Sequence, residues 1–329
     1  MSENQSEWAI EADGLVKTFG DNRAVDGVDL RVRTGTVYGV LGPNGAGKTT
    51  TISMLATLLR PDGGSARVFG HDVLREPHTV RQLIGVTGQY ASVDEKISGI
   101  ENLIVFGRLL GLGHRAAKAK GEQLLEAFDL ADAAKRPVEK YSGGMRRRLD
   151  LASSLISQPP LIFLDEPTTG LDPRTRGQMW EVIRGLVTNG STVLLTTQYL
   201  DEADQLASRI AVIDHGRVVA EGTADELKGL VGEASLLLRL ADATQTEQAV
   251  DAIQDVLGSA ATVTPEAARI TAPMSDPERV TDLLIRLRER GIQLTELSVQ
   301  KPTLDEVFLT ITGHGADETP SPDDEEAAA

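Results

Sequence analysis

The sequence predicts a layered α/β domain followed by a smaller α+β domain. Short apolar runs at 37–41, 161–164 and 192–196 are typical of strands that are buried on both faces of a sheet. Longer segments with helical spacing lie between them, for example at 50–59 and 174–187. This alternation indicates helices packed in layers on a central sheet.

The chain is expected to fold as two domains. Residues 8–228 form the first, and residues 92–160, which are mainly helical, predict a helical subdomain inserted in it. The composition changes near residue 229, and beyond Tyr199 the only aromatic residue is Phe308. We therefore expect a separate C-terminal accessory domain at 229–313.

The C-terminal domain is predicted to have the order β-α-β-β-α-β, which is the ferredoxin-like split motif. Its expected elements are a strand at 235–240, a helix at 247–257, strands at 261–264 and 269–271, a helix at 277–290 and a strand at 294–300. The second helix has one apolar face, made of Val280, Leu283, Leu284 and Leu287. A last helix is expected at 303–312, because Thr303 and Glu306 match a capping box. The acidic tail at 314–329 predicts disorder.

Composition excludes several classes of protein. The chain has 49 acidic and 33 basic residues, a net charge of −16 and no cysteine. The lack of cysteine excludes disulfide scaffolds, Cys-ligated metal sites and thiol catalysis. The negative charge disfavours nucleic acid as a partner, so a phosphate site must be local. With no apolar run of 18 residues and no basic-apolar leader, we expect a cytoplasmic protein.

One segment matches the phosphate-binding loop (P-loop) pattern G-x-x-x-x-G-K-[ST], between a predicted strand and a predicted helix. It consists of Gly42, Pro43, Asn44, Gly45, Ala46, Gly47, Lys48 and Thr49. Its backbone N–H groups can converge on phosphate oxygens, and the helix from Thr50 adds its positive end to the nucleotide site. Lys48 is expected to reach the β- and γ-phosphates of ATP, and the Thr49 hydroxyl to bind Mg²⁺. The alternative is a glycine-rich turn with a solvated lysine.

Two adjacent acids, Asp165 and Glu166, follow the apolar run at 161–164. Successive side chains of a strand point in different directions, so one carboxylate can bind a metal while the other faces a water molecule. We expect Asp165 to bind Mg²⁺. Glu166 is expected to be the general base or to orient the attacking water. The alternative is a pair of solvated acids at the end of a strand.

The order of these motifs resembles that of the ATP-binding subunits of ATP-binding-cassette (ABC) transporters. Between the P-loop and Asp165 the chain has Gln89 and then Tyr-Ser-Gly-Gly-Met at 141–145, which is similar to the signature loop of that superfamily. Gly-Leu-Asp-Pro follows at 170–173. The resemblance covers about residues 8–228. It implies a P-loop NTPase with a RecA-like core and a helical subdomain.

Four segments are similar to the ATP-binding subunits of daunorubicin/doxorubicin-resistance exporters, namely 87–95, 141–151, 195–204 and 304–309. The last of them lies in the C-terminal domain. The resemblance therefore extends beyond the cassette, and it implies an ATPase that works with a separate integral membrane permease.

Family cassettes work as head-to-tail dimers, with two ATP molecules between the P-loop of one subunit and the signature of the other. The resemblance implies a homodimer in which Ser142, Gly143 and Gly144 donate hydrogen bonds to a γ-phosphate across the interface. It also implies that Asp172 lies at the dimer contact. The alternative for Asp172 is a helix N-cap ahead of Pro173, and both can hold.

Two further residues take their expected roles from the resemblance. Gln89 would contribute to the Mg²⁺ and water shell and relay the nucleotide state to the permease, and the alternative is a solvated loop glutamine. Phe19 would stack on adenine, and the alternative is burial in the core, because stacking and burial leave the same trace in a sequence.

The chain departs from the superfamily pattern at three positions. Tyr141 and Met145 replace the usual leucine and glutamine at the ends of the signature, although its Ser-Gly-Gly core is intact. Gln198 stands where most members carry a switch histidine. A glutamine can donate to a γ-phosphate but cannot carry a proton charge. We therefore expect Gln198 to position the phosphate and hydrolysis to be slow.

Three arginines, Arg146, Arg147 and Arg148, follow the signature in the first turn of a helix expected to begin near Gly144. A positive charge there costs about 0.3–1 kcal/mol per residue. Such a run favours anionic partners. Phosphate contact, pairing with acids of this chain and simple solvation all remain open.

The leading hypothesis is a motor subunit that hydrolyses MgATP to export a hydrophobic drug or antibiotic, attached through a permease to the inner face of the membrane. The alternative is a soluble cassette ATPase of DNA repair or translation. Repair members carry a long coiled-coil insertion and translation members two cassettes, and this sequence has neither. The C-terminal domain is expected to support assembly, or alternatively to sense a ligand, because a fold alone assigns no function.

Overall fold

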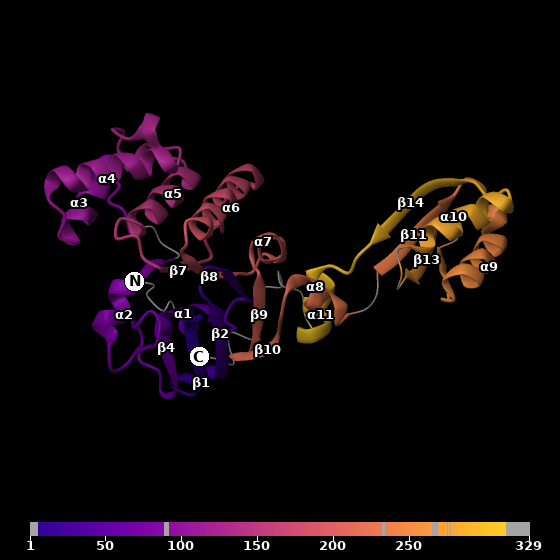
Figure 1. Ribbon diagram of the computed structural model, residues 1–329, viewed down its shortest axis with the longest axis horizontal. Coiled ribbons are helices and arrows are strands. Elements are labelled where there is room, and N and C mark those ends of the chain that lie inside the picture. The colour runs from indigo at the N-terminus through magenta and orange to yellow at the C-terminus, as the bar shows by residue number, and fades with distance from the viewer. Residues whose placement is uncertain are drawn as a thin grey trace. The chain divides into compact units, whose positions relative to one another are not determined.

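The computed structural model describes residues 6–88, 92–231, 234–264, 269–274, 276 and 278–313. Over these residues the chain divides into two compact units, one ending at Ala224 and the other spanning Asp225–Gly313 (Figure 1). No helix in the described ranges is long and apolar enough to cross a membrane. The tail predicted to be disordered, 314–329, lies outside the described residues.

A six-stranded sheet with the order β10-β9-β3-β8-β7-β6 lies at the centre of the first unit. Its strands are β3 (Val37–Leu41), β6 (Ile84–Thr87), β7 (Leu161–Asp165), β8 (Thr192–Thr197), β9 (Arg209–Asp214) and β10 (Arg217–Gly222). All neighbours pair in parallel except β10, which is antiparallel to β9. The three apolar runs of the sequence are thus confirmed as central strands.

The two faces of this sheet belong to two different hydrophobic cores. Leu161 and Phe163 of β7 point into one core, whereas Ile162 and Leu164 point into the other. Because side chains alternate along a strand, a run that is apolar at every position can supply both cores at once. This explains why β7 is buried at all five positions.

An antiparallel sheet covers one side of the first unit, with the order β2-β1-β4-β5. Its strands are β1 (Trp8–Phe19), β2 (Asn22–Arg33), β4 (Gly63–Val68) and β5 (His71–Asp72). The sequence patterns do not predict this sheet. Its strands have one exposed face, and the pairing of β1 with β2 shifts register several times, so neither gives a continuous apolar run.

Helices fill the remaining layers of the first unit. They are α1 (Lys48–Leu55), α2 (Pro77–Leu83), α3 (Gly99–Leu109), α4 (His114–Ala127), α5 (Gly143–Ser154), α6 (Pro173–Thr188) and α7 (Leu200–Leu206), with short 3₁₀ turns η1 (Ala131–Ala133) and η2 (Val138–Lys140). Helices α3, α4 and α5 gather at the end of the unit away from β1 and β4 (Figure 1). Ser98 and Glu101 form a capping box that starts α3.

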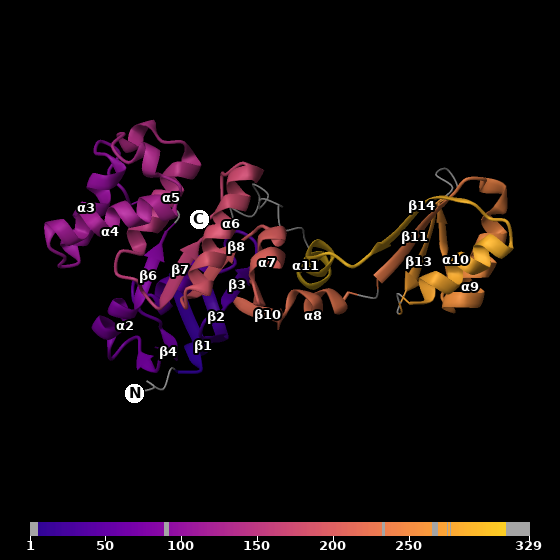
Figure 2. The ribbon, with the colours of Figure 1, turned by 45° about the horizontal axis from the view of Figure 1, so that its top comes forward.

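The second unit contains a four-stranded antiparallel sheet with the order β12-β13-β11-β14. Its elements are β11 (Ala234–Leu240), η3 (Ala243–Gln245), α9 (Thr246–Leu257), β12 (Thr262–Thr264), β13 (Arg269–Met274), α10 (Arg279–Glu289) and β14 (Leu294–Gln300). The expected order of strands and helices is confirmed. Helices α9 and α10 lie side by side on one face of this sheet (Figure 2).

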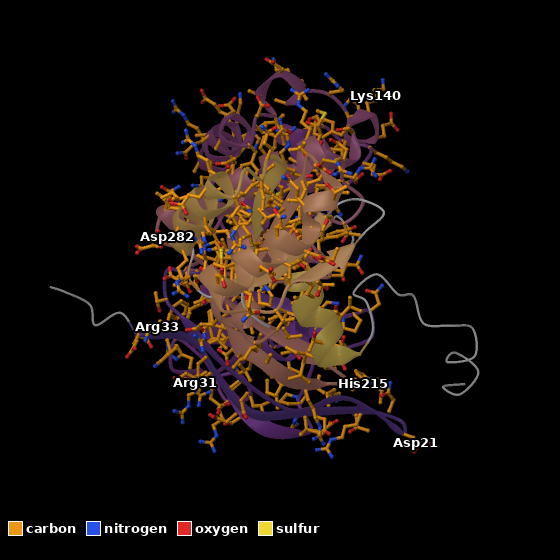
Figure 3. The ribbon with its side chains drawn as sticks, turned by 90° about the vertical axis from the view of Figure 1, so that its right-hand side faces the viewer. Asp21, Arg31, Arg33, Lys140, His215 and Asp282 are labelled. Carbon is orange, nitrogen blue, oxygen red and sulfur yellow. The ribbon has the colours of Figure 1, made fainter. Side chains whose placement is uncertain are left out.

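The apolar face predicted for α10 is correct at three of its four positions. Leu283 and Leu287 are buried, and Val280 packs against the same core. Leu284, in contrast, is 41% exposed, and Asp282 extends outward from the helix (Figure 3). The core of this small unit contacts only a narrow side of α10, so it covers only part of the apolar stripe.

Two short helices complete the second unit, namely α8 (Ala224–Gly229) and α11 (Leu304–Thr312). They lie side by side in both views (Figures 1 and 2). The capping box predicted for α11 is confirmed, since Thr303 accepts from the Glu306 amide and Glu306 accepts in return. Leu304, Val307 and Phe308 are buried, outside the core that α9 and α10 share with the sheet.

The contrast between two neighbouring leucines of α10 gives a stability test. Leu283→Ala should lower the free energy of unfolding of the second unit by about 2–5 kcal/mol, because it leaves a cavity in the core. Leu284→Ala, the matched control, should cost less than about 1 kcal/mol. Hydrogen exchange of peptides from β11 to β14 measures both. Equal effects would contradict the assignment of Leu283 to the core.

Candidate active site

Three adjacent strands bring the predicted motifs to one edge of the central sheet. Strand β8 pairs in parallel with β3 on one side and with β7 on the other. Thr196 of β8 lies opposite Val40 of β3 and Asp165 of β7, so the P-loop, Glu166 and Gln198 all follow strand ends at the same level. The carboxyl edge of a parallel sheet is where ligands bind in open α/β folds.

The P-loop follows β3 and fits closely against neighbouring backbone. A side chain at Gly42 would come within 2.2 Å of the Ile213 carbonyl oxygen, and one at Gly47 within 2.4 Å of the Ala24 carbonyl oxygen. Gly47 also has a φ of +103°, which side chains rarely adopt. Glycine is therefore required at both positions.

A small cavity of about 140 Å³ opens at this loop. It is lined by Asn44, Gly45, Ala46, Gly47, Lys48, Thr49, Thr50 and Glu166. The N-cap of α1 is Gly47, which has no side chain to accept a hydrogen bond from the first backbone N–H groups of the helix. The structure thus brings together the P-loop and the second of the two predicted acids.

Lys48 is buried in the loop, with only 4% of its surface exposed. Its ammonium group donates to the carbonyl oxygens of Gly42 at 2.7 Å and Pro43 at 2.9 Å, and lies 3.8 Å from Glu166 Oε1. Burial lowers the pKa of Lys48, and the charges of Glu166 and Asp165 oppose this effect. The alternative of a solvated lysine is wrong.

Asp165 is a buried carboxylate held by two hydroxyl groups. Thr196 Oγ1 donates to Asp165 Oδ1 at 2.5 Å, and Thr49 Oγ1 donates to the same oxygen at 3.2 Å. Asp165 is 5% exposed, so the alternative of a solvated acid is wrong for this residue. Two of the three residues predicted to contribute to the Mg²⁺ site, Thr49 and Asp165, are thus in direct contact.

Glu166 has an unusual backbone conformation. Its φ is +48°, in the left-handed region that non-glycine residues seldom adopt. Its amide donates to the backbone and side-chain oxygens of Thr196, and Thr169 Oγ1 donates to Glu166 Oε2 at 3.2 Å. These contacts turn the carboxylate toward the cavity beside Lys48.

Gln198 follows β8 and lies just before α7. The Arg176 guanidinium lies 4.3 Å from the centre of the Tyr199 ring and 3.3 Å from an Asp201 carboxylate oxygen. Trp180 Nε1 of α6 donates to Glu202, whose carboxyl is fully buried and whose pKa is raised by that burial. Helix α6 therefore anchors the segment that follows Gln198.

Ser142, Gly143 and Gly144 start α5 and do not line the P-loop cavity. Ser142 is the N-cap of the helix, because its hydroxyl accepts from the Met145 amide at 3.2 Å. A side chain at Gly144 would come within 2.2 Å of Thr175 Cγ2, whereas one at Gly143 would meet nothing within 4 Å. Within one chain, the signature residues therefore do not form part of the P-loop cavity.

The remaining predicted residues have different outcomes. Asp172 is the N-cap of α6, where its carboxylate accepts from the Thr175 amide and hydroxyl, which lower its pKa. This confirms the helix-cap interpretation. Phe19 is 50% exposed beside Lys17, so its interpretation as a core residue is wrong. Gln89 lies outside the described residues.

The three arginines of α5 find partners within the chain. Arg146 pairs with Glu95 at 2.6 Å, and Arg148 donates to the Phe128 carbonyl oxygen at 2.9 Å and lies 3.5 Å from Asp129. Arg147 donates to backbone carbonyls on both sides of Glu166. Pairing within the chain is thus the interpretation that the structure supports.

The sequence did not reveal Thr196 as a residue of the site, and it did not reveal the carbonyl partners of Arg147. Thr196 lies inside an apolar strand, where a threonine usually serves only β propensity. The signal that could have revealed it is its place one residue before the end of the strand next to β7. The run of arginines pointed to Arg147, but the partners of Arg147 come from residues far along the chain.

The Thr196 hydroxyl offers a direct test of how Asp165 is held. Thr196→Val keeps the shape but removes the donor, so the free energy of unfolding should fall by about 1.5–3 kcal/mol. Binding of MgATP should weaken as well. Thr196→Ser keeps the hydroxyl and should retain MgATP affinity. Urea unfolding and equilibrium binding measure both effects, and identical behaviour of the two variants would contradict this role.

Comparison with known proteins identifies the family. The family model "ABC transporter" matches residues 25–169. The chain is 56% identical to the daunorubicin/doxorubicin resistance ATP-binding protein DrrA of Streptomyces peucetius, over 94% of each chain. It is 47% identical to the doxorubicin resistance ATP-binding protein DrrA of Mycobacterium tuberculosis, over 92% of this chain and 93% of the relative.

A solved structure agrees with these relatives. The ADP conformation of an ATP-binding cassette of an ABC transporter has a TM-score of 0.61 and 25% identity, covering 67% of this chain and 92% of the cassette. The chain is also 37% identical to the Nod factor export ATP-binding protein I of Sinorhizobium fredii, over 95% of this chain and 88% of the relative. This protein therefore belongs to the ATP-binding subunits of ABC transporters, as an ATPase close to the daunorubicin/doxorubicin resistance proteins.

Proposed function

We propose that this chain is the motor subunit of an exporter that removes a hydrophobic drug or antibiotic through a separate integral membrane permease. The observation that carries the proposal is that Lys48, Thr49 and Glu166 line one cavity. The Thr49 hydroxyl also donates a hydrogen bond to the Asp165 carboxylate. The export role is supported by relatives that are named as daunorubicin or doxorubicin resistance ATP-binding proteins. The subunit would lie in the cytoplasm, on the inner face of the membrane, attached through the permease.

The residues present fit a magnesium ion bound together with ATP. Mg²⁺ prefers oxygen ligands and usually takes one or two from protein, and the rest from phosphates and water. The Thr49 hydroxyl and the Asp165 carboxylate are adjacent oxygens of this kind, 3.2 Å apart. When bound, Mg²⁺ would neutralise charge on the β- and γ-phosphates. Gln89 is proposed as a further contributor to this shell.

Hydrolysis requires a water molecule placed beside the γ-phosphate. The Glu166 carboxylate is proposed to orient this water and to accept its proton. The buried Lys48 ammonium is proposed to stabilise the negative charge that develops on the phosphate. Gln198, at the end of the neighbouring strand, is proposed to donate from its amide to the same phosphate.

Two copies of the cassette are proposed to share each ATP molecule. Ser142 and the amides of Gly143 and Gly144 lie at the start of α5, where the N-terminal end of a helix favours a phosphate. Because these residues do not line the P-loop cavity of their own chain, the phosphate would come from a second copy. Asp172 would lie at this contact while it caps α6, and Phe19, half exposed, would stack on adenine.

The C-terminal unit is proposed to have a ferredoxin-like fold and to support assembly of the paired cassettes with the permease. The order of its strands, β12-β13-β11-β14, and the two helices on one face support this fold. Its role in assembly is supported by the lack of any motif of the nucleotide site beyond residue 205. The alternative is a ligand-sensing unit.

The role of Glu166 is testable by a conservative change. Glu166→Gln should lower kcat by about 10²–10⁴-fold, because the amide cannot accept a proton from water. ATP binding should persist, and size-exclusion chromatography with ATP should show a trapped dimer. Lys48→Ala should instead weaken ATP binding itself. Turnover by Glu166→Gln at the parent rate would rule out this role.

Substitution of Gln198 is expected to change kcat without changing the affinity for ATP. Gln198→Ala should lower kcat by about 10–100-fold with little change in ATP affinity, because the lost contact acts mainly in the transition state. Gln198→His should support turnover at least as well as the parent. Steady-state kinetics together with equilibrium ATP binding would detect both outcomes. An unchanged kcat in the alanine variant would show that Gln198 is a bystander.

A further inference from the structure

Arg147 of α5 makes more hydrogen bonds to the site than any role assigned above requires. Its Nε donates to the Pro167 carbonyl oxygen at 3.1 Å, and one terminal nitrogen donates to the Asp165 and Glu166 carbonyl oxygens at 2.8 and 3.1 Å. The other terminal nitrogen donates to the Gly88 carbonyl oxygen. A single guanidinium therefore binds three successive carbonyls around Glu166 and a fourth from another strand end.

The carbonyls that Arg147 binds surround a residue with a strained backbone conformation. Glu166 is the middle residue of the three and has a φ of +48°, a conformation that persists only where neighbouring groups fix it. Thr196 binds the Glu166 amide from the β8 side, while Arg147 binds its carbonyl from the α5 side. The peptide groups on both sides of Glu166 are thus held by partners from separate elements.

The surroundings of Arg147 hold its guanidinium in place. Its side chain is only 11% exposed, and Asp150 of the same helix lies 3.9 Å from the guanidinium. Asp150 in turn accepts from the Ser92 amide and hydroxyl, each at 2.8 Å. Burial lowers the pKa of Arg147 and the surrounding carboxylates oppose this, so the guanidinium stays charged.

We propose that Arg147 is a positioning residue for hydrolysis: by binding the carbonyls of Asp165, Glu166 and Pro167, it keeps the Glu166 carboxylate aimed into the P-loop cavity. Lysine cannot replace it. An ammonium group is a single point with three donors, whereas the planar guanidinium spreads five N–H donors over carbonyls that lie on different sides. This inference rests on the proposed role of Glu166 in hydrolysis.

The experiment compares Arg147→Lys with Arg146→Lys in the full-length chain. Arg146 is its neighbour and pairs only with Glu95 among the contacts that the described residues show, so Arg146→Lys should leave kcat within about twofold of the parent. Arg147→Lys should lower kcat about tenfold or more while KM and ATP affinity change less than about threefold. Thermal unfolding of both variants identifies a merely structural loss, which would lower stability without this split.

A double-mutant cycle with Glu166→Gln completes the test in single-turnover experiments. If Arg147 acts through Glu166, Arg147→Lys should slow the residual hydrolysis of Glu166→Gln by less than about threefold. An unchanged kcat in Arg147→Lys, or equal slowing in both backgrounds, would overturn the inference. If Glu166→Gln itself turned over ATP at the parent rate, the proposed function of Glu166 would fail instead, so the two failures are distinguishable.

Discussion

The pairing of β8 between β3 and β7 is the constraint on which the site depends. It sets Thr196 opposite Asp165 in a buried position, and the resulting hydrogen bond of 2.5 Å fixes a carboxylate that would otherwise be expensive to bury. The same register places Thr49 within 3.2 Å of that carboxylate. A shift of one residue in β7 or β8 would turn Asp165 or Thr196 to the opposite face of the sheet. The chemistry of the cassette therefore begins with the alignment of three strands.

Helix α5 shows how a locally unfavourable sequence can serve a site. Three arginines near the start of a helix oppose its dipole. In the folded chain each guanidinium has a carboxylate or carbonyl partner, and Arg147 reaches the carbonyls around Glu166. Conflicts between local propensity and the observed structure are expected at functional sites, because the cost is offset by contacts made there. The strained φ of Glu166 is a second conflict of this kind, in direct contact with the first.

The second unit follows simpler rules. Its core consists of aliphatic residues from one face of the sheet and from the inner sides of α9 and α10, with buried residues such as Leu238, Ile253 and Leu283. Helix α11 is started by a capping box that could be recognised from two residues. A core of this type specifies packing and stability, and the chemical groups of the site all belong to the first unit.

The sequence by itself determined the features that depend on near neighbours along the chain. The P-loop glycines, the apolar strands and the two acids after β7 follow local patterns, so the α/β fold and most residues of the site could be predicted. Only the tertiary structure decided the rest. Strands β1 and β2 are buried on one face only and have no continuous apolar run. Leu284 and Leu287 share a stripe, but of these two only Leu287 is buried, and the partners of Arg147 lie up to 59 residues away. Such outcomes depend on contacts between distant segments, which exist only once the strands have paired and the helices have packed on them.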